Sequence, residues 1–430
     1  MKNKNIAIVG GGLNGIFLAY EFVKKGYTNI TLYEKGSAVG GLLGCYDFDG
    51  VKLEKYYHHV FNTDKNLLDL IQELGLQNDL IFKESSIGNL KNGKIVPFVT
   101  PMDLFKYPYL SFLSKIRVGF FSLFLQKCPY GEKFRNLKVE SWIKKYMGRG
   151  AWNNLWKPIF QKKFHQYTST LSLSFLWTRL YIRANSREGG KEMLGYMKGS
   201  FYRIVDRVVV SLQNKVIIKT NSNIQSFDDY RLVVDGISYH YDIIVSTLAT
   251  PIFADLIDAN VYKSFYSALH SVNYLSVICP LFVFDKPITT YYRINNVDES
   301  IDIGGIIEHT NLFNFPDYHN KKFMYFSHYL TSLSPLLKMD EEYLKSYYLD
   351  VFKKALHISE QPKDIYIAKD MFAQPVYTAD FPNELIGFKT PILGVYQCNM
   401  VNFLPIERGI NSSIMIAKKF IDYISFHGNH

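Results

Sequence analysis

The sequence predicts an α/β fold, with a Rossmann-like dinucleotide-binding domain and an α+β domain that combines a mixed sheet with a helical block. Three observations lead to this prediction. A glycine-rich turn at 10–15 lies between a strand pattern and a helix pattern. An aromatic, helical stretch at 139–184 is followed by alternating strand patterns, and a further strand and helix pattern occupies 391–424.

The first of these features is the N-terminal strand, turn and helix. Residues 5–9 form an apolar run typical of a buried parallel strand. The following GxGxxG spacing permits a tight turn, close approach of a pyrophosphate and close packing of the next helix. Apolar residues at helical spacing predict that helix over 13–25, with its N-terminus facing the phosphates. We expect the cofactor contacts of this turn to be Gly10, Gly12, Leu13, Asn14 and Gly15.

An acidic residue and a second glycine pair follow. Residues 30–33 read as the second strand, and Glu34 closes it at about the 20-residue distance where a carboxylate binds a ribose. The next glycine pair would let a second loop pass close to the diphosphate. This continuation indicates FAD and not NAD. The predicted contacts here are Glu34, Lys35, Gly40, Gly41 and Leu42.

The amino-acid composition limits which binding partners and which cellular compartment are expected. The 430 residues suffice for two domains, and their net charge of +10 is spread along the chain without a nucleic-acid-binding motif, so we expect no nucleic acid. Anionic lipid headgroups or a phosphorylated substrate would suit this charge, and so would general solubility. The four cysteines are scattered, so we expect no metal site, and the lack of a secretory leader favours a reducing cytoplasm.

The segment 105–127 is aromatic and aliphatic but contains Lys115 and Arg117, and it falls short of a transmembrane helix. Three interpretations fit it equally: a helix resting on a membrane surface, a helix covering an apolar substrate tunnel, or an ordinary core helix. Peripheral membrane contact therefore stays open for this segment.

The rest of the chain gives a coarser pattern. Helices are expected at 139–146, 151–164, 173–184 and 341–356. Strands are expected at 215–220, 222–226, 231–235, 241–247, 275–284, 303–308 and 322–330.

Residues 5–41 resemble the N-terminal signature of the flavin amine oxidase superfamily. That group includes protoporphyrinogen oxidases, carotenoid desaturases, monoamine oxidases and, more distantly, UDP-galactopyranose mutases. The whole chain most resembles a bacterial branch of protoporphyrinogen-oxidase-like and phytoene-desaturase-like NAD(P)/FAD-dependent oxidoreductases, through YYHHVFNTD (56–64), IEHTNL (307–312) and AQPVY (373–377). The resemblance implies an FAD domain assembled from 1–95, 200–250 and 369–430, and a substrate domain from 96–199 and 251–368.

The resemblance also assigns cofactor contacts farther along the chain. It implies that the backbone of Ile224 faces the adenine and that Thr247 ends a strand near the dinucleotide. A helix over 412–424 would close over the flavin, where its N-terminal dipole stabilises negative charge near N1 and O2. The segment before it supplies Glu407, Arg408, Gly409 and Ile410. Many relatives have Ala-Gly-Asp where this chain has Gln397-Cys398-Asn399-Met400.

Candidates for the reaction are His58 and His59, Glu308 and His309, and Tyr377. The segment of the two adjacent histidines lines one flavin face in relatives, and histidine changes charge near neutral pH. Neighbouring residues of a strand point to opposite faces, so we expect at most one of them to meet the flavin. Each candidate also suits a structural hydrogen-bonding or packing role.

We therefore expect a cytoplasmic FAD-dependent oxidoreductase, at the inner face of the membrane if 105–127 binds lipid. It would act on a hydrophobic or lipid-linked, sugar-bearing intermediate by hydride transfer at flavin N5, in line with the link of this branch to polysaccharide biosynthesis, with NAD(P)H as a candidate electron donor. One alternative is a flavin-dependent sugar mutase or isomerase without net redox. Another is an assembly protein that retains FAD without catalysis.

Overall fold

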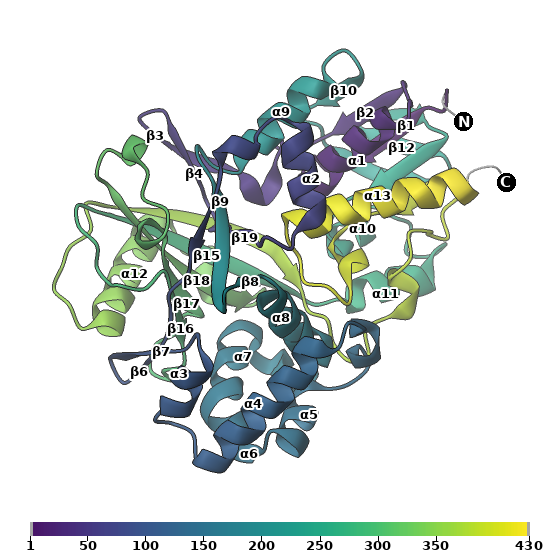
Figure 1. The fold of residues 1–430 in the computed structure, drawn as a ribbon. Coiled ribbons are helices and arrows are strands. Elements are labelled where there is room, and N and C mark those ends of the chain that lie inside the picture. The colour runs from purple at the N-terminus through teal and green to yellow at the C-terminus, as the bar shows by residue number, and fades with distance from the viewer. Residues whose placement is uncertain (1–2, 428–430) are drawn as a thin grey trace.

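The computed structural model describes residues 3–427, and its first part is organised around a five-stranded parallel sheet that draws strands from both ends of the chain (Figure 1). The strand order is β10, β2, β1, β14, β20, and every neighbouring pair is parallel. The strands are β1 (Ile6–Val9), β2 (Ile30–Tyr33), β10 (Val216–Lys219), β14 (Ile243–Ser246) and β20 (Val395–Gln397). Three regions far apart in the sequence therefore meet in one sheet, as a discontinuous Rossmann-like domain requires.

Alternation along β1 shows how this sheet is covered. Ile6 and Ile8 belong to the core beneath the helices, whereas Ala7 and Val9 belong to the core on the opposite face. The helical face carries α1 (Leu13–Lys24), α9 (Tyr202–Leu212) and α13 (Ile410–His427). The opposite face carries β11 (Ile224–Asp228), β12 (Arg231–Val234), β13 (Ile237–His240), α10 (Thr250–Ala254) and α11 (Lys263–Ser271).

A seven-stranded mixed sheet forms the second part of the molecule, in the order β19, β15, β18, β17, β16, β6, β7. Its strands are β6 (Ile87–Lys91), β7 (Lys94–Pro97), β15 (Tyr274–Phe284), β16 (Arg293–Asn296), β17 (Gly305–Glu308), β18 (Lys322–Thr331) and β19 (Asp364–Pro375). Helix α12 (Glu341–Leu356), predicted with the same bounds, packs on one face. The sheet thus includes 87–95 and 369–375, which the sequence placed with the FAD domain.

The helical block lies below this sheet in Figure 1. It contains α3 (Pro101–Lys106), α4 (Phe112–Lys127), α5 (Val139–Tyr146), α6 (Arg149–Ala151), α7 (Lys157–Phe164) and α8 (Leu173–Asn185). A π-helical turn, Trp152–Trp156, joins α6 to α7, so the helix expected over 151–164 changes its winding midway. Buried Trp152, Trp156 and Trp177 form its core with Leu275 and Val277 of β15, which fixes the block against the mixed sheet.

The remaining elements connect the two sheets. They are β3 (Cys45–Phe48), β4 (Val51–Glu54), α2 (Lys65–Glu73), β5 (Leu80–Glu84), β8 (Arg187–Glu188) and β9 (Lys191–Met197). Strand β9 pairs with β5, so the chain leaving the helical block returns beside the chain that entered it. Among residues 3–427, no helix has the length and apolar composition needed to cross a membrane.

Candidate functional site

The glycine-rich turn after β1 is closely packed at two positions. Gly10 has a φ of +105°, and a Cβ added there would lie 2.5 Å from Thr247 Oγ1. A Cβ at Gly15 would collide with the carbonyl oxygen of Gly10. Both positions therefore require glycine, the first for its conformation and the second for the contact between helix and turn.

The remaining glycine of the GxGxxG spacing, Gly12, faces open space. Gly12 is the N-cap of α1 without a side-chain cap, and a Cβ added to it would meet no atom within 4 Å. The second glycine loop passes directly beside it, since a Cβ on Gly41 would lie 3.1 Å from Gly12 Cα and Gly40 N donates to Gly11 O at 2.8 Å. The N–H groups at the start of α1 thus face a gap that a diphosphate fits.

Glu34 joins the two loops beside this gap. Its Oε2 accepts from Gly11 N at 2.7 Å and its Oε1 accepts from Gly36 N at 2.6 Å. Its carbonyl oxygen accepts from Ser222 N at 2.9 Å, which brings the segment before Ile224 to the same edge of the sheet, whereas the side chain of Lys35 is exposed. The carboxylate lies where the sequence places a ribose, and that contact remains a prediction.

The C-terminal ends of two strands complete this edge. Thr247, directly after β14, donates its hydroxyl to Val9 O at 2.9 Å and to Gly10 O at 3.0 Å. Asn14 in the first turn of α1 donates to Cys398 O at 3.2 Å, directly after β20. The predicted cofactor residues of the first 42 positions, Thr247 and the C-terminal segment are therefore neighbours, and the donor set fits FAD.

A cavity of about 590 Å³ lies between the mixed sheet, the helical block and the C-terminal loop. Five residues predicted to contact the cofactor line it, namely Leu42, Glu407, Arg408, Gly409 and Ile410. Apolar side chains from α3, α4, α7 and α8 line the opposite wall, including Leu104, Val118, Leu123, Phe160 and Leu176. The residues predicted to contact the flavin and the apolar side chains of the helical block therefore border the same cavity.

Both candidate histidines line this cavity. The strand alternation from which we expected at most one of them to meet the flavin does not apply here, because β4 ends at Glu54 and residues 55–59 are irregular chain. His58 Nδ1 lies 2.6 Å from Tyr56 O, and burial and the charge of Arg408 lower the pKa of His58 to about 4. His59 Nδ1 lies 3.2 Å from Tyr292 OH.

Glu407 connects the C-terminal loop to the helical block. Its Oε1 accepts from Arg179 Nη2 at 2.7 Å and from Lys163 Nζ at 3.2 Å. Burial raises its pKa, but the two cations outweigh that effect and the pKa of Glu407 falls to about 2. Arg408 donates to Tyr329 OH at 2.9 Å, so this loop is also fixed to β18 of the mixed sheet.

The other three catalytic candidates do not line the cavity. Glu308 is buried and accepts hydrogen bonds from Ile288 N and from Thr289 N and Oγ1 at 2.6 to 2.7 Å. His309 Nε2 lies 2.9 Å from Tyr318 OH in the core. Tyr377 donates to Met400 O at 2.5 Å. These side chains hold turns together and are not presented to a substrate, because tertiary partners that the sequence pattern does not reveal satisfy them.

Sequence reasoning identified Arg408 but missed the other cationic residues of the cavity. Six cationic side chains and three carboxylates line the cavity, and the cations are Lys163, Arg179, Arg183, Arg187, Arg293 and Arg408. A partial signal was present in the helix predicted over 173–184, where Arg179 and Arg183 are four residues apart and therefore lie on one face. That face meets the cavity, whereas Arg187 lies beyond the helix, on β8.

Helix α4 presents apolar side chains both inward and outward. Val118 is buried and lines the cavity, Leu123 borders both the cavity and solvent, and Phe120 and Phe124 are 65% and 51% exposed. The exposed apolar surface of α3 and α4, hereafter the α3–α4 surface, comprises Met102, Phe105, Phe112, Leu113, Ile116, Phe120, Leu123 and Phe124. An ordinary core helix would not expose so many large apolar residues. Two interpretations of 105–127 are left, a helix on a membrane surface and a helix covering an apolar substrate tunnel. The α4 residues that line the cavity support the second.

Comparison with known proteins follows this geometry. A family model described as flavin containing amine oxidoreductase matches residues 13–384. The chain is 39% identical over 80 residues to zeta-carotene desaturase of Synechocystis sp. strain PCC 6803, covering 18% of this chain and 16% of that protein. The match thus spans about a sixth of the length of that curated relative.

Solved structures match over nearly the whole chain. A protein of Exiguobacterium sp. 255-15, provisionally assigned as a protoporphyrinogen oxidase, has a TM-score of 0.77 at 19% identity, covering 99% of both chains. Reduced UDP-galactopyranose mutase has a TM-score of 0.76 at 15% identity, covering 99% of this chain and 94% of that one. At these identities the likeness shows the fold.

Proposed function

The chain belongs to the flavin-containing amine oxidoreductase family, with FAD as its cofactor, and we propose that it is an oxidoreductase acting on an apolar or lipid-linked substrate. The observation that carries the proposal is the shared cavity, in which the predicted flavin contacts at 407–410 face apolar side chains of the helical block. A cavity that combines an apolar wall with charged and polar side chains at defined positions is typical of a small-molecule site.

The residues that would hold FAD follow the edge of the parallel sheet. The N-terminus of α1 and Gly12 would take the diphosphate, Glu34 a ribose, and residues 407–410 the flavin end. When bound, FAD supplies hydride chemistry at N5 of its ring. The residues of the protein would hold the substrate, exclude water and transfer protons.

His58 is placed to accept a proton. His58 Nδ1 lies 2.6 Å from the carbonyl oxygen of Tyr56, which can only accept, so Nδ1 carries the hydrogen and Nε2 keeps a lone pair. Its lowered pKa of about 4 keeps the ring neutral at pH 7. We propose that His58 relays the proton released from the substrate: its neutral ring can accept the proton, and burial and the charge of Arg408 disfavour its staying protonated, so the proton passes on.

The α3–α4 surface suggests how a lipid-linked substrate would enter. Leu104 and Leu123 lie on helices that also carry the exposed residues Phe105 and Phe124, so one pair of helices borders both solvent and the cavity. Exposed Lys106 and Lys127 flank these helices, as expected for contact with anionic headgroups. We propose that this surface rests on a membrane and admits the apolar chain.

Anaerobic flavin spectroscopy tests the function. The FAD-loaded protein is mixed with NADH, NADPH and lipid-linked sugars, and loss of the oxidised flavin absorbance is followed. The proposal predicts bleaching by a substrate or a nicotinamide donor, and re-oxidation by the complementary partner. The variant His58→Gln should keep its FAD but slow the substrate half-reaction by about 10²-fold to 10⁴-fold.

Two results would replace the proposal. Turnover of a sugar by the pre-reduced protein, with no electron acceptor consumed, would identify a mutase or isomerase; the structural likeness to UDP-galactopyranose mutase makes this experiment necessary. A protein that retains FAD but is neither reduced nor re-oxidised by any tested compound would be an assembly component.

A further inference from the structure

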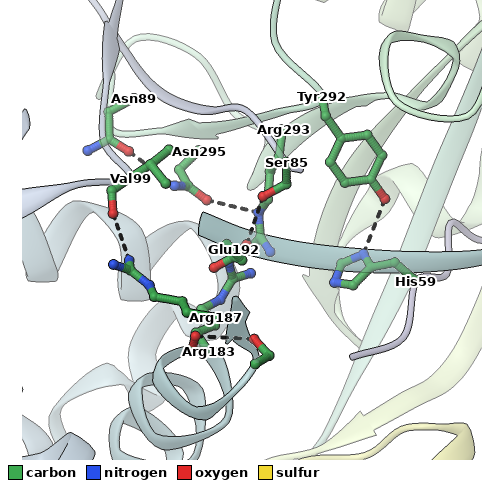
Figure 2. Close-up of polar contacts among 11 residues, drawn as sticks. His59, Ser85, Asn89, Val99, Arg183, Arg187, Glu192, Tyr292, Arg293 and Asn295 are labelled. Atoms are coloured by element: carbon green, nitrogen blue, oxygen red, sulfur yellow. Dashed lines mark hydrogen bonds and ion pairs between the residues drawn. The ribbon is translucent and has the colours of Figure 1, made fainter. Parts of the chain in front are cut away.

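Three arginines gather in the part of the cavity bordered by α3. Arg183 comes from α8, Arg187 from β8 and Arg293 from β16, and all three line the cavity. Figure 2 shows Arg183 and Arg293 beside Glu192 of β9, with Arg187 reaching toward Val99. Arg183 and Arg187 lie four residues apart in the sequence, whereas Arg293 comes from a distant strand.

The cluster has more positive charge than its carboxylate neutralises. Arg183 Nη1 donates to both oxygens of Glu192, at 2.7 and 2.8 Å. Arg187 Nη2 donates to Val99 O at 2.7 Å, and Arg293 Nε donates to Asn295 Oδ1 at 3.2 Å. Within residues 3–427 neither of these two arginines forms an ion pair with an acidic side chain, so two positive charges remain without a matching anion.

Keeping such charges inside a protein is unfavourable without a partner. Burial, together with the charge of Arg183, lowers the pKa of Arg293 to about 10. A guanidinium has five N–H donors, and Arg187 and Arg293 each use one of them on the neighbouring protein. Both arginines line the cavity, where an anion could pair with the donors that the protein leaves unused.

We propose that Arg187 and Arg293, supported by Arg183, bind a phosphate or diphosphate group of the substrate. The inference rests on the proposed function, because the anion belongs to the molecule that reaches His58. Two unmatched charges correspond to a phosphoryl dianion and exceed the single charge of a carboxylate. The forked guanidinium also matches the oxygens of a phosphoryl group in a bidentate manner.

The surroundings of the cluster identify the rest of the ligand. Arg187 binds the backbone at Val99, and the next cavity residues are Thr100, Pro101 and Leu104, at the start of the α3–α4 surface. On the other side, Tyr292 precedes Arg293 and contacts His59. An apolar chain on the α3 side, the phosphoryl group at the arginines and the reacting group near the histidines would therefore lie in order, as in a lipid diphosphate whose phosphoryl end carries a sugar.

Calorimetric titration of the FAD-loaded protein tests this site, with geranyl diphosphate as the probe. Geraniol and inorganic pyrophosphate separate the contributions of the chain and of the anion. The variants Arg187→Gln and Arg293→Gln should each raise the Kd of geranyl diphosphate roughly 10-fold to 100-fold, the usual effect of losing a charged hydrogen bond. Arg293→Lys, which keeps the charge, should lose less affinity than Arg293→Gln.

The matched control is Arg231→Gln. Arg231 lies on β12 and forms an exposed ion pair with Asp228 of β11, and this variant should bind geranyl diphosphate like the wild type. Unchanged affinity in Arg187→Gln and Arg293→Gln would overturn the proposal, as would geraniol binding as tightly as the diphosphate. Pyrophosphate binding as tightly as geranyl diphosphate would overturn the assignment to a lipid-borne group. If any of these results were obtained but a different substrate still reduced the flavin, the phosphoryl site would be wrong and the proposed oxidoreductase function would stand.

Discussion

Glu407 is the residue through which the cofactor half of the molecule contacts the helical block. It pairs with Lys163 of α7 and Arg179 of α8, while the neighbouring Arg408 contacts Tyr329 of β18. These contacts make the C-terminal segment a junction of three parts of the fold. A charge removed here should affect both stability and the shape of the cavity.

The stability of this junction should depend on pH. The pKa of Glu407 is lowered from 4.5 to about 2, so its stabilisation is complete above pH 4.5 and is lost as the pH falls towards 2. Glu407→Gln should lower the free energy of unfolding by about 3 kcal/mol near pH 6. Urea unfolding of both proteins at several pH values measures the difference. A difference that stays constant down to pH 2.5 would contradict the assignment.

Glu34 holds the two glycine loops by hydrogen bonds to Gly11 N and Gly36 N. Glu34→Ala should weaken FAD retention at least 10-fold, because charged hydrogen bonds of about 1.5 to 3 kcal/mol are lost beside the ribose position. The FAD content after gel filtration measures this effect. Glu84→Ala, which removes an exposed ion pair with Lys191, is the control and should retain FAD. Equal retention by Glu34→Ala and wild type would show that the ribose assignment is wrong.

At the scale of elements, the sequence was most informative where a pattern is local. The helix at 341–356 and the strand–turn–helix at the N-terminus could be predicted because periodicity and glycine spacing lie within one element. The 105–127 segment is two helices, α3 and α4, whose faces differ. Which face meets solvent depends on the other helices of the block, and the sequence of the segment does not contain that information.

The α3–α4 surface should bind anionic membranes. Replacing Phe120 and Phe124 together by Ser should lower the fraction of protein that sediments with phosphatidylglycerol vesicles. Each buried aromatic side chain contributes about 1.5 to 3 kcal/mol, so the partition constant should fall by at least 10-fold. Leu333→Ser, at a residue that is 88% exposed elsewhere, is the control. Vesicle binding unchanged by the double replacement would contradict a membrane role for this surface.

At the scale of the whole molecule, a cofactor edge and a cationic, apolar cavity are assembled from segments far apart in the sequence. The cofactor edge could be predicted, since Gly10, Gly12 and Glu34 have a spacing that chemistry dictates. The cavity cations could not, because Arg187 and Arg293 meet only after β8 and β16 are placed. The sequence also could not show that Glu308 and Tyr377 have buried hydrogen-bonding partners. Those partners, Thr289 and Met400, are brought to them by tertiary packing.

The central claim is that one FAD site, assembled from these separated segments, opens into the cavity that holds the substrate. A crystal structure of the FAD-loaded protein measures this most directly. We predict the diphosphate beside Gly12, a ribose hydroxyl within hydrogen-bonding distance of Glu34, and the flavin ring between residues 407–410 and the cavity that contains His58. Electron density for FAD whose ring lies outside this cavity, or whose diphosphate lies away from the N-terminus of α1, would contradict the account.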